Sequence, residues 1–269
     1  MPLKQLIRRA LEKIYHAPVW PNRWRRAAGL FYVLNYEFGG RYYGSQWSPG
    51  LLRKAWQVQD TIGFKYGHYE TMARWSCLDS EMRPIAWYTY PALEFLQQLD
   101  FSDKAIFEYG CGNSTLFWAR QARRVVSVEN DAAWYAKIGP QLPPHCEITL
   151  ATDPTDYINA PDSYPEGFDV IVVDGANEQK ERFLCAQKAV AHLRPGGFII
   201  LDNSDFLPES SRFLRESGLL EIDFTGFGPI NHFPWTTSLY LSRDYNFAPR
   251  GARQPFSGMG ALDEIWPEK

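Results

Sequence analysis

The sequence predicts an α/β protein whose main domain holds a seven-stranded, mostly parallel sheet with an antiparallel last strand. From Lys104 onward, short apolar segments alternate with helical segments, which is typical of parallel strands joined by helices. The last two apolar segments are joined by a loop too short for a helical crossover, so they should pair antiparallel. Before Lys104 the chain opens with a helical or irregular extension.

Residues 1–83 are predicted to form this N-terminal extension, and residues 84–269 the main domain. In 3–14, apolar residues follow the i, i+3, i+4 spacing of one helical face while basic residues take the other. The stretch from Pro21 to Trp56 is rich in aromatic residues and glycine, which favours irregular or short helical structure. A further helix is expected over 91–99, because proline suits the first helical turn.

The strands of the main domain are predicted from short apolar runs bounded by turn residues. Buried on both faces, parallel strands carry nearly continuous apolar sequence, and most of these runs do. The predicted strands are 105–109, 125–129, 147–150, 170–173, 198–201, 219–224 and 236–241.

Charge is distributed unevenly along the chain. The formal net charge is -3, whereas residues 1–57 hold ten Lys or Arg against Glu12 and Glu37. A negative total argues against a general nucleic-acid binder, so no nucleic-acid partner is expected. The basic first helix could contact anionic lipid as a peripheral membrane element, but packing of its apolar face on the main domain is the preferred interpretation.

Cysteine usage and hydropathy bear on location. The four cysteines show neither pairing nor metal-ligand spacing, as expected for a reduced, cytoplasmic protein. No apolar run reaches the roughly 18 residues of a membrane-spanning helix. The sequence does not indicate an oligomeric state.

A glycine turn follows the first predicted strand. The run Glu108-Tyr109-Gly110-Cys111-Gly112-Asn113-Ser114-Thr115 leads from the strand into a helix. Glycine permits close approach of the backbone to a ligand, and the helix start offers free amide donors. The next strand ends at Glu129, 19 residues after Gly110, where a carboxylate could bind the hydroxyls of a ribose. Together these features predict a nucleoside-binding crevice.

At this point the sequence resembles the class I S-adenosylmethionine-dependent methyltransferases, over about residues 84–243. Their first motif is similar to 108–112, their ribose-binding acid to Glu129, their fourth-strand motif to 168–175 and their turn before the fifth strand to 193–197. The wider pattern, including Pro84, resembles bacterial members whose acceptor cannot be named. The resemblance implies a Rossmann-like fold and S-adenosylmethionine as the cofactor. It assigns cofactor contacts to Glu108, Tyr109, Gly110, Cys111, Gly112, Ser114, Thr115, Glu129, Asn130, Asp153 and Asp174.

One of these assignments has alternatives. By the resemblance, Asp153 would meet the amino group of adenine, although Thr152 or Asp156 could take that role.

The chemistry of the reaction is expected after the fourth and fifth strands. Asp174, Asp202 and Asn203 are similar to the divalent-metal ligands of the catechol and caffeoyl-coenzyme A O-methyltransferases. Three oxygen ligands suit Mg²⁺, which could lower the pKa of an acceptor hydroxyl. The alternative is that both aspartates cap helices while Asn203 orders the loop, and that interpretation is slightly preferred. His232, in the loop before the last strand, is a candidate general base.

The predicted function is O-methylation of a small-molecule or glycan-like acceptor. Aromatic residues of the extension could form a lid over that acceptor, or could simply pack in a core. Two other functions stay open: an NAD(P)-dependent oxidoreductase with the same glycine turn, and a catalytically silent S-adenosylmethionine-binding adapter. The aromatic residues concerned are Trp20, Trp24, Phe31, Tyr42, Tyr43, Trp47 and Trp56.

Overall fold

A computed structural model describes residues 49–175, 179–252 and 254–261. The predicted first helix and the aromatic residues between Trp20 and Trp47 lie outside the described residues. So does the surface that the first helix would offer to a membrane.

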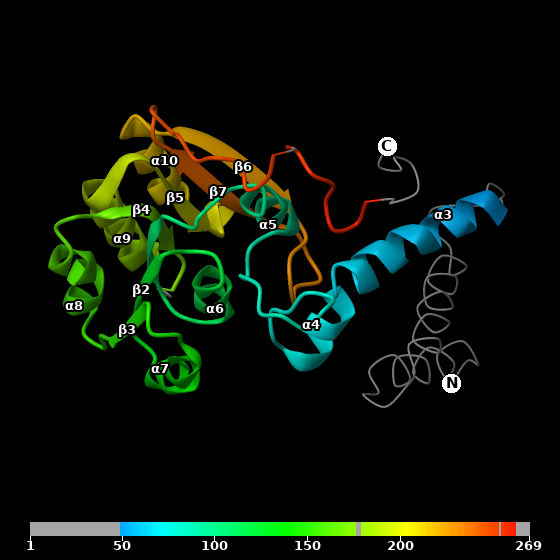
Figure 1. Ribbon diagram of the computed structural model, residues 1–269, viewed down its shortest axis with the longest axis horizontal. Helices are drawn as coiled ribbons and strands as arrows, with labels where there is room; N and C mark the ends of the chain where they lie inside the picture. Colours follow the sequence, from blue (N-terminus) through cyan, green and yellow to red (C-terminus); the bar gives the residue numbers. More distant parts are fainter. Residues whose placement is uncertain (1–48, 176–178, 253, 262–269) are drawn as a thin grey trace.

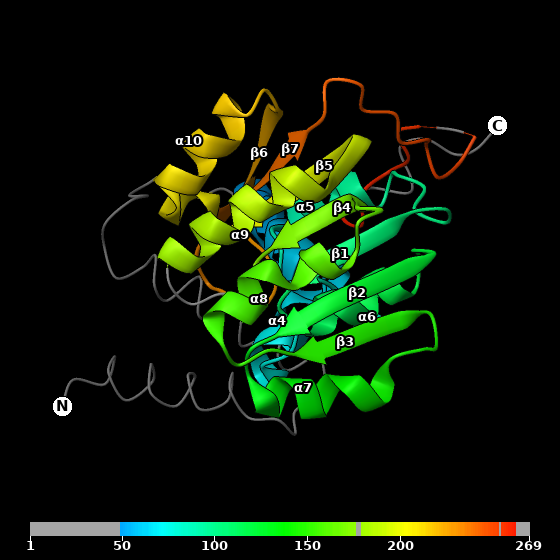
Figure 2. The ribbon, with the colours of Figure 1, turned by 90° about the vertical axis from the view of Figure 1, so that its left-hand side faces the viewer.

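A single seven-stranded sheet forms the centre of the molecule, in the order β3-β2-β1-β4-β5-β7-β6 (Figure 2). Only β7 runs antiparallel to its neighbours β5 and β6, while the other pairs are parallel. The predicted fold class and all seven strands are therefore confirmed. The strands are β1 (Ala105–Tyr109), β2 (Arg124–Glu129), β3 (Cys146–Leu150), β4 (Phe168–Val173), β5 (Leu193–Asp202), β6 (Leu220–Gly226) and β7 (Trp235–Leu241).

The largest difference from the predicted strands lies at the start of β5. The run 193–197, expected as a turn before the strand, belongs to it. The pairing with β4 shifts there, because Phe168 pairs with Leu193 but Val170 pairs with Phe198. Gly196 has a φ of +78°, which an L side chain rarely adopts. The expected turn is thus a glycine-bearing irregularity inside a longer strand.

Helices cover both faces of the sheet, as Figure 2 shows. The helices α8 (Pro154–Asn159), α9 (Gln179–His192) and α10 (Pro208–Glu216) pack on one face, and α5 (Tyr90–Leu96) and α6 (Asn113–Ala119) on the other. Strand β1 feeds both cores: Ile106 lies in the cluster with α5 and α6, and Phe107 in the cluster with α8 and α9. The helix α7 (Ala132–Ile138) contacts β2 and β3 at the sheet edge.

Two helices precede α5 in the described part of the chain. Helix α3 (Pro49–Asp60) continues into a π-helical turn, Thr61–Lys65, and α4 (His68–Arg74) follows (Figure 1). Of the irregular or short helical structure expected up to Trp56, residues 49–56 take the helical form, as part of a regular helix that begins at Pro49. The ring of Trp56 is exposed. None of the helices within the described ranges is long and apolar enough to cross a membrane.

Helix α4 is joined to the main domain through buried polar groups. His68 and Thr71 are both buried, and His68 Nδ1 lies 3.1 Å from the hydroxyl of Tyr90, at the start of α5. Helix α5 begins one residue before its predicted start and ends at Leu96. The domain boundary between residues 83 and 84 stays a prediction.

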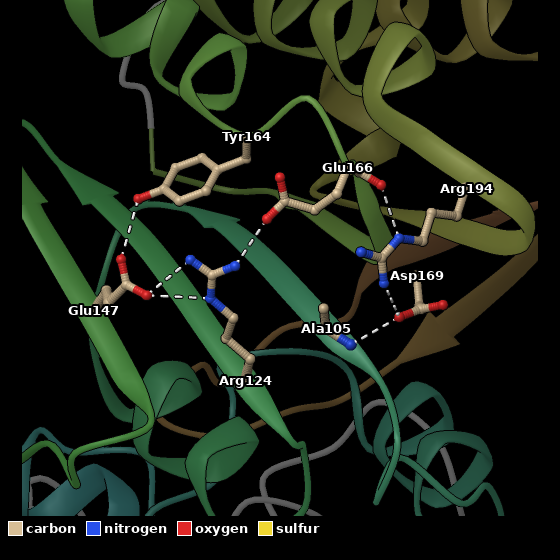
Figure 3. A network of polar contacts seen from close by, with 7 residues as sticks. All are labelled: Ala105, Arg124, Glu147, Tyr164, Glu166, Asp169 and Arg194. Carbon is tan, nitrogen blue, oxygen red and sulfur yellow. Dashed lines mark hydrogen bonds and ion pairs between the residues drawn. The ribbon is translucent and has the colours of Figure 1, made fainter.

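Ion pairs connect the amino ends of the parallel strands (Figure 3). Arg124, the first residue of β2, donates to Glu147 on β3 and to Glu166 in the turn before β4. Arg194 donates to Asp169, which also accepts a hydrogen bond from the backbone N–H of Ala105 at 2.8 Å. This edge of the sheet is therefore held by charges of both signs in direct contact.

Candidate cofactor and active site

A cavity of about 270 Å³ lies at the carboxyl ends of the central strands. Ligands of open α/β sheets bind in such a position, where the chain turns from strand to helix. The cavity is bounded by the glycine turn after β1, the residues after β2 and β4, the start of α7, the segment after α4 and the loop before β7. Its lining includes Glu108, Tyr109, Gly110, Cys111, Gly112, Ser114, Glu129, Asn130 and Asp174.

The glycine turn is shaped by close backbone contact. Gly110 has a φ of +95°, and a Cβ placed there would lie 2.7 Å from the Cα of Gly175. The backbone N–H of Gly175 donates to the carbonyl of Tyr109 at 2.7 Å, which holds the two turns together. Gly112 differs, because a Cβ added there would meet no atom within 4 Å. Gly110 is thus required by the protein's own packing, whereas Gly112 keeps space free beside the cavity.

Glu108 lies at the cavity but is almost completely buried. Its Oε2 accepts hydrogen bonds from Thr115 at 2.6 Å and Ser127 at 3.1 Å. Its Oε1 is buried and has no hydrogen-bond partner in the described part of the chain. Burial raises the pKa of Glu108 to about 7, against a lowering by the surrounding hydroxyls. A buried carboxylate oxygen without a partner is costly, and a cationic ligand group would relieve that cost.

Glu129 ends β2 with its carboxylate held by backbone donors. Oε2 accepts from the N–H of Cys111 at 2.7 Å, and Oε1 accepts from the N–H groups of Asn130 and Asp131. A carboxylate can accept about four hydrogen bonds, so these three leave room for a ligand hydroxyl. Glu129 therefore fixes the glycine turn and also borders the cavity.

Five of the predicted site residues do not line this cavity: Thr115, Asp153, Asp202, Asn203 and His232. Asp153 caps α8, where its Oδ1 accepts from the N–H of Thr155 at 2.7 Å, and it lines a separate hollow with Thr152 and Asp156. His232 is exposed, and the residue of its loop that lines the cavity is Ile230. Thr115 lies directly behind the cavity, where it joins Glu108 to the N–H of Gly112.

One arginine contacts all three residues that were candidate metal ligands. Arg182, on α9, pairs with Asp174 Oδ1 at 3.3 Å and donates to Asn203 Oδ1 at 3.3 Å and to the carbonyl of Asp202 at 3.0 Å. A guanidinium thus takes the place that a divalent cation would need. Among the described residues, no group of three or more His, Cys, Asp or Glu side chains is arranged to hold a metal ion. These residues therefore do not fit Mg²⁺.

The helix-cap interpretation also needs correction at Asp202, whereas Asn203 was expected only to order the loop. Asp202 Oδ1 accepts from the indole N–H of Trp235 at 3.1 Å and from the hydroxyl of Thr237, so it anchors β7. Asn203 takes the left-handed conformation with a φ of +55° and makes no side-chain cap bond. Burial raises the pKa of Asp202 and of Asp174, and Arg182 partly opposes this at both carboxylates.

Comparison with known proteins gives structural likeness at low identity. Neither a family model nor a curated protein matches the sequence. Precorrin-6y C5,15-methyltransferase from Geobacter metallireducens has 14% identity and a TM-score of 0.45, over 61% of this chain and 89% of that one. The N-methyltransferase NodS from Bradyrhizobium japonicum has 14% identity and a TM-score of 0.44, over 56% and 93%. A putative rRNA methylase from Clostridium thermocellum has 15% identity and a TM-score of 0.42, over 60% and 99%.

The topology of the sheet assigns the fold without these likenesses. Seven strands, with only β7 reversed between β5 and β6, form the sheet expected from the motifs at 108–112 and 168–175. The chain has the class I methyltransferase fold.

Within this methyltransferase fold, several residues that line the cavity were not predicted from the sequence. Asn113, at the start of α6, donates to the hydroxyl of Ser76 and to the carbonyl of Cys77 at 2.6 Å. This contact joins segments 36 residues apart, and no sequence pattern predicts it. Trp134 could have been found, because it lies one helical turn after the strand-end acid. The full set of unforeseen lining residues is Trp75, Ser76, Cys77, Trp87, Asn113, Asp131, Trp134, Lys137, Gly175 and Ile230.

Proposed function

We propose that the protein is an S-adenosylmethionine-dependent methyltransferase that acts on an oxygen of a small-molecule or glycan-like acceptor. The observation that carries the proposal is one cavity that contains an open position at Gly112, a buried oxygen of Glu108 without a partner, and the strand-end acid Glu129. Each feature corresponds to a different part of the cofactor.

Residues around the cavity supply groups that fit the parts of S-adenosylmethionine. Glu108 Oε1 suits the ammonium group, since a buried anion is stabilised by an opposite charge. Glu129 has remaining acceptor capacity for a ribose hydroxyl. Trp134 offers a flat face for adenine, and Lys137 Nζ lies 4.2 Å from the centre of its ring. When bound, the cofactor supplies a methyl group on a positively charged sulfur.

Asp174 is the proposed proton acceptor. It lines the cavity, and its ion pair with Arg182 fixes its orientation. Its raised pKa makes it a stronger base than an ordinary aspartate, which favours removal of the proton from an acceptor hydroxyl. Arg182 is a positioning residue that acts by orienting Asp174. Its guanidinium lies where a metal ion bound by Asp174 and Asn203 would lie.

Gly112→Ala tests cofactor binding with little disturbance of the apo protein. An alanine methyl at this position meets no protein atom within 4 Å, so the melting temperature without ligand should be unchanged. The methyl would occupy cavity space, and S-adenosylhomocysteine affinity should fall about tenfold or more. Gly139→Ala is the matched control, because Gly139 lies outside the cavity and its added Cβ makes only an ordinary contact at 3.9 Å.

Two ligands and one methyl-transfer assay distinguish the proposed function from its alternatives. S-adenosylhomocysteine should raise the melting temperature of the wild-type protein through preferential binding to the folded state. A saturable response to NAD without one to S-adenosylhomocysteine would replace the methyltransferase by an oxidoreductase. Binding of S-adenosylhomocysteine, with no transfer of a labelled methyl group to any of a panel of phenols, sugars and glycans, would favour the silent adapter.

A further inference from the structure

One side of the cavity is built from uncharged residues that lie apart from the cofactor motifs. We call Trp75, Cys77, Trp87 and Ile230 the apolar wall. The charged residues of the lining are different in origin: they come from β1, the end of β2, the residue after β4, and α7 with the residue before it. The wall comes instead from the segment that follows α4 and from the loop between β6 and β7. Charged and uncharged parts of the lining are therefore supplied by different elements of the fold.

The two tryptophans of the wall both line the cavity, and their rings contact each other. Trp75 follows α4 in the left-handed conformation, with a φ of +51°, and its side chain is largely exposed at 72%. Its ring meets that of Trp87 edge to face, with centroids 6.3 Å apart. Burial normally drives a tryptophan ring into a core, so an exposed ring fixed at a cavity is suited to a ligand.

Ile230 lies in the wall with a strained backbone conformation, which a hydrogen bond to Thr71 holds in place. Its φ of +68° is unusual for a β-branched residue. Its N–H donates at 2.8 Å to the hydroxyl of Thr71, which is buried in α4. Figure 1 shows the loop between β6 and β7 reaching down to α4, as this bond requires. Strain of this kind persists where surrounding contacts impose it, and it is concentrated at ligand sites.

The wall is also fixed relative to the glycine turn. Asn113, the first residue of α6, binds the carbonyl of Cys77 and the hydroxyl of Ser76 through its amide. The segment that carries Trp75 is thereby held against the helix that starts at the turn. A ligand on the wall would consequently lie at a set distance from a cofactor on the turn.

We propose that the apolar wall binds the flat, uncharged face of a ring in the methyl acceptor. This inference rests on the proposed function, and it names the chemistry of the acceptor. Both an aromatic ring and the C–H face of a sugar ring pack on indoles in this way, through dispersion and burial of apolar surface. The absence of charged side chains from the wall disfavours acceptors that carry a charge on this face.

Ring probes and a tryptophan variant test the wall. We would titrate 4-methylphenol, methyl β-D-glucopyranoside and the acyclic glycerol into the protein, with and without saturating S-adenosylhomocysteine, using saturation-transfer NMR and calorimetry. At least one ring probe should bind more tightly than glycerol, and the two ring probes decide between an aromatic and a sugar acceptor. Trp75→Ala should weaken that ring probe about fivefold or more while S-adenosylhomocysteine affinity is preserved. Trp56→Ala, at another exposed tryptophan outside the cavity, should change neither affinity.

The outcomes separate this inference from the proposed function. If neither ring probe binds better than glycerol, or if Trp75→Ala binds it as well as the wild type does, the wall is not an acceptor site. If S-adenosylhomocysteine itself fails to bind, the proposed function fails, and the same titrations on the cofactor-free protein still decide whether the wall binds rings.

Discussion

The amino ends and the carboxyl ends of the strands in this sheet differ in how their charged side chains are paired. At the amino ends of the strands, Arg124 and Arg194 contact the carboxylates of Glu147, Glu166 and Asp169 directly (Figure 3). At the carboxyl ends, the four acids Glu108, Glu129, Asp131 and Asp174 line the candidate cavity, and Arg182 is the cation paired with Asp174.

This difference means that charged residues at the amino ends of the strands contribute to stability, whereas those at the carboxyl ends form the candidate site. Charge pairs at the amino edge satisfy each other, so they add modest stability and leave no group for a ligand. The carboxyl edge instead holds a buried oxygen without a partner, on Glu108, and left-handed backbone at Ile230. Such features cost stability and persist where a site requires them. The comparison predicts that substitutions at the two edges will have different consequences.

The largest effect is expected from Gly110→Ala at the carboxyl edge. The substitution combines a φ of +95° with a Cβ only 2.7 Å from Gly175, so it should destabilise the protein by about 3 kcal/mol or more. Gly218→Ala is the control, since Gly218 has a φ of +87° but no atom within 4 Å of an added Cβ. It should cost only about 1–2 kcal/mol. Equal losses in urea denaturation would show that the close contact with Gly175 contributes nothing.

Glu108→Gln should change the pH dependence of both stability and binding. A folded-state pKa raised to about 7 means that this group stabilises the cofactor-free protein at low pH, and that the stability is lost as pH rises from 4.5 through about 7. The loss is about 3 kcal/mol, because one pKa unit corresponds to about 1.4 kcal/mol. The variant should flatten this part of the stability curve. S-adenosylhomocysteine should bind wild-type protein more weakly at pH 6 than at pH 8, and the variant weakly at both.

The exposed Glu216→Gln serves as the control for this variant. It should leave the stability curve and the pH dependence of binding as they are in the wild type. If Glu108→Gln retained wild-type affinity at pH 8, the carboxylate would have no role in holding the ammonium group.

A smaller effect is expected from Arg182→Met. Removal of the cation beside Asp174 should lower the free energy of unfolding by about 1–3 kcal/mol at pH 8. Since the pKa of Asp174 is already raised, protonation at lower pH should reduce this cost. The exposed Arg212→Met should cost little at either pH.

Wild-type protein should show no Mg²⁺-dependent melting shift, whereas a shift abolished by Asp174→Asn would restore the metal hypothesis.

The smallest effect is expected at the amino edge, from Arg124→Ala. The arginine is partly exposed, so its ion pairs with Glu147 and Glu166 should contribute about 1 kcal/mol or less, and less at high salt. S-adenosylhomocysteine affinity should be unchanged, because the network lies at the edge remote from the cavity. Weakened cofactor binding in this variant would contradict the separation of the two edges.

The sequence predicted the sheet well because its signals are local. Alternating apolar segments place each strand, and the short loop before β7 requires an antiparallel pair. The glycine turn and Glu129 were found for the same reason, since each directly follows its own strand. The bounds of the helix that begins at Pro49 were not predicted, because aromatic and glycine-rich composition is a weak guide to local conformation.

Contacts between distant segments were decided only by the tertiary structure. Asp174, Asp202 and Asn203 fit a metal site in type and order, although the helix-cap interpretation was slightly preferred, and neither interpretation included Arg182, which reaches all three from α9. The apolar wall likewise depends on Thr71 meeting Ile230, 159 residues away. A residue's type and its neighbours in sequence determine which chemistry it can perform. Packing determines which partner it meets, because that choice depends on how elements far apart along the chain approach one another.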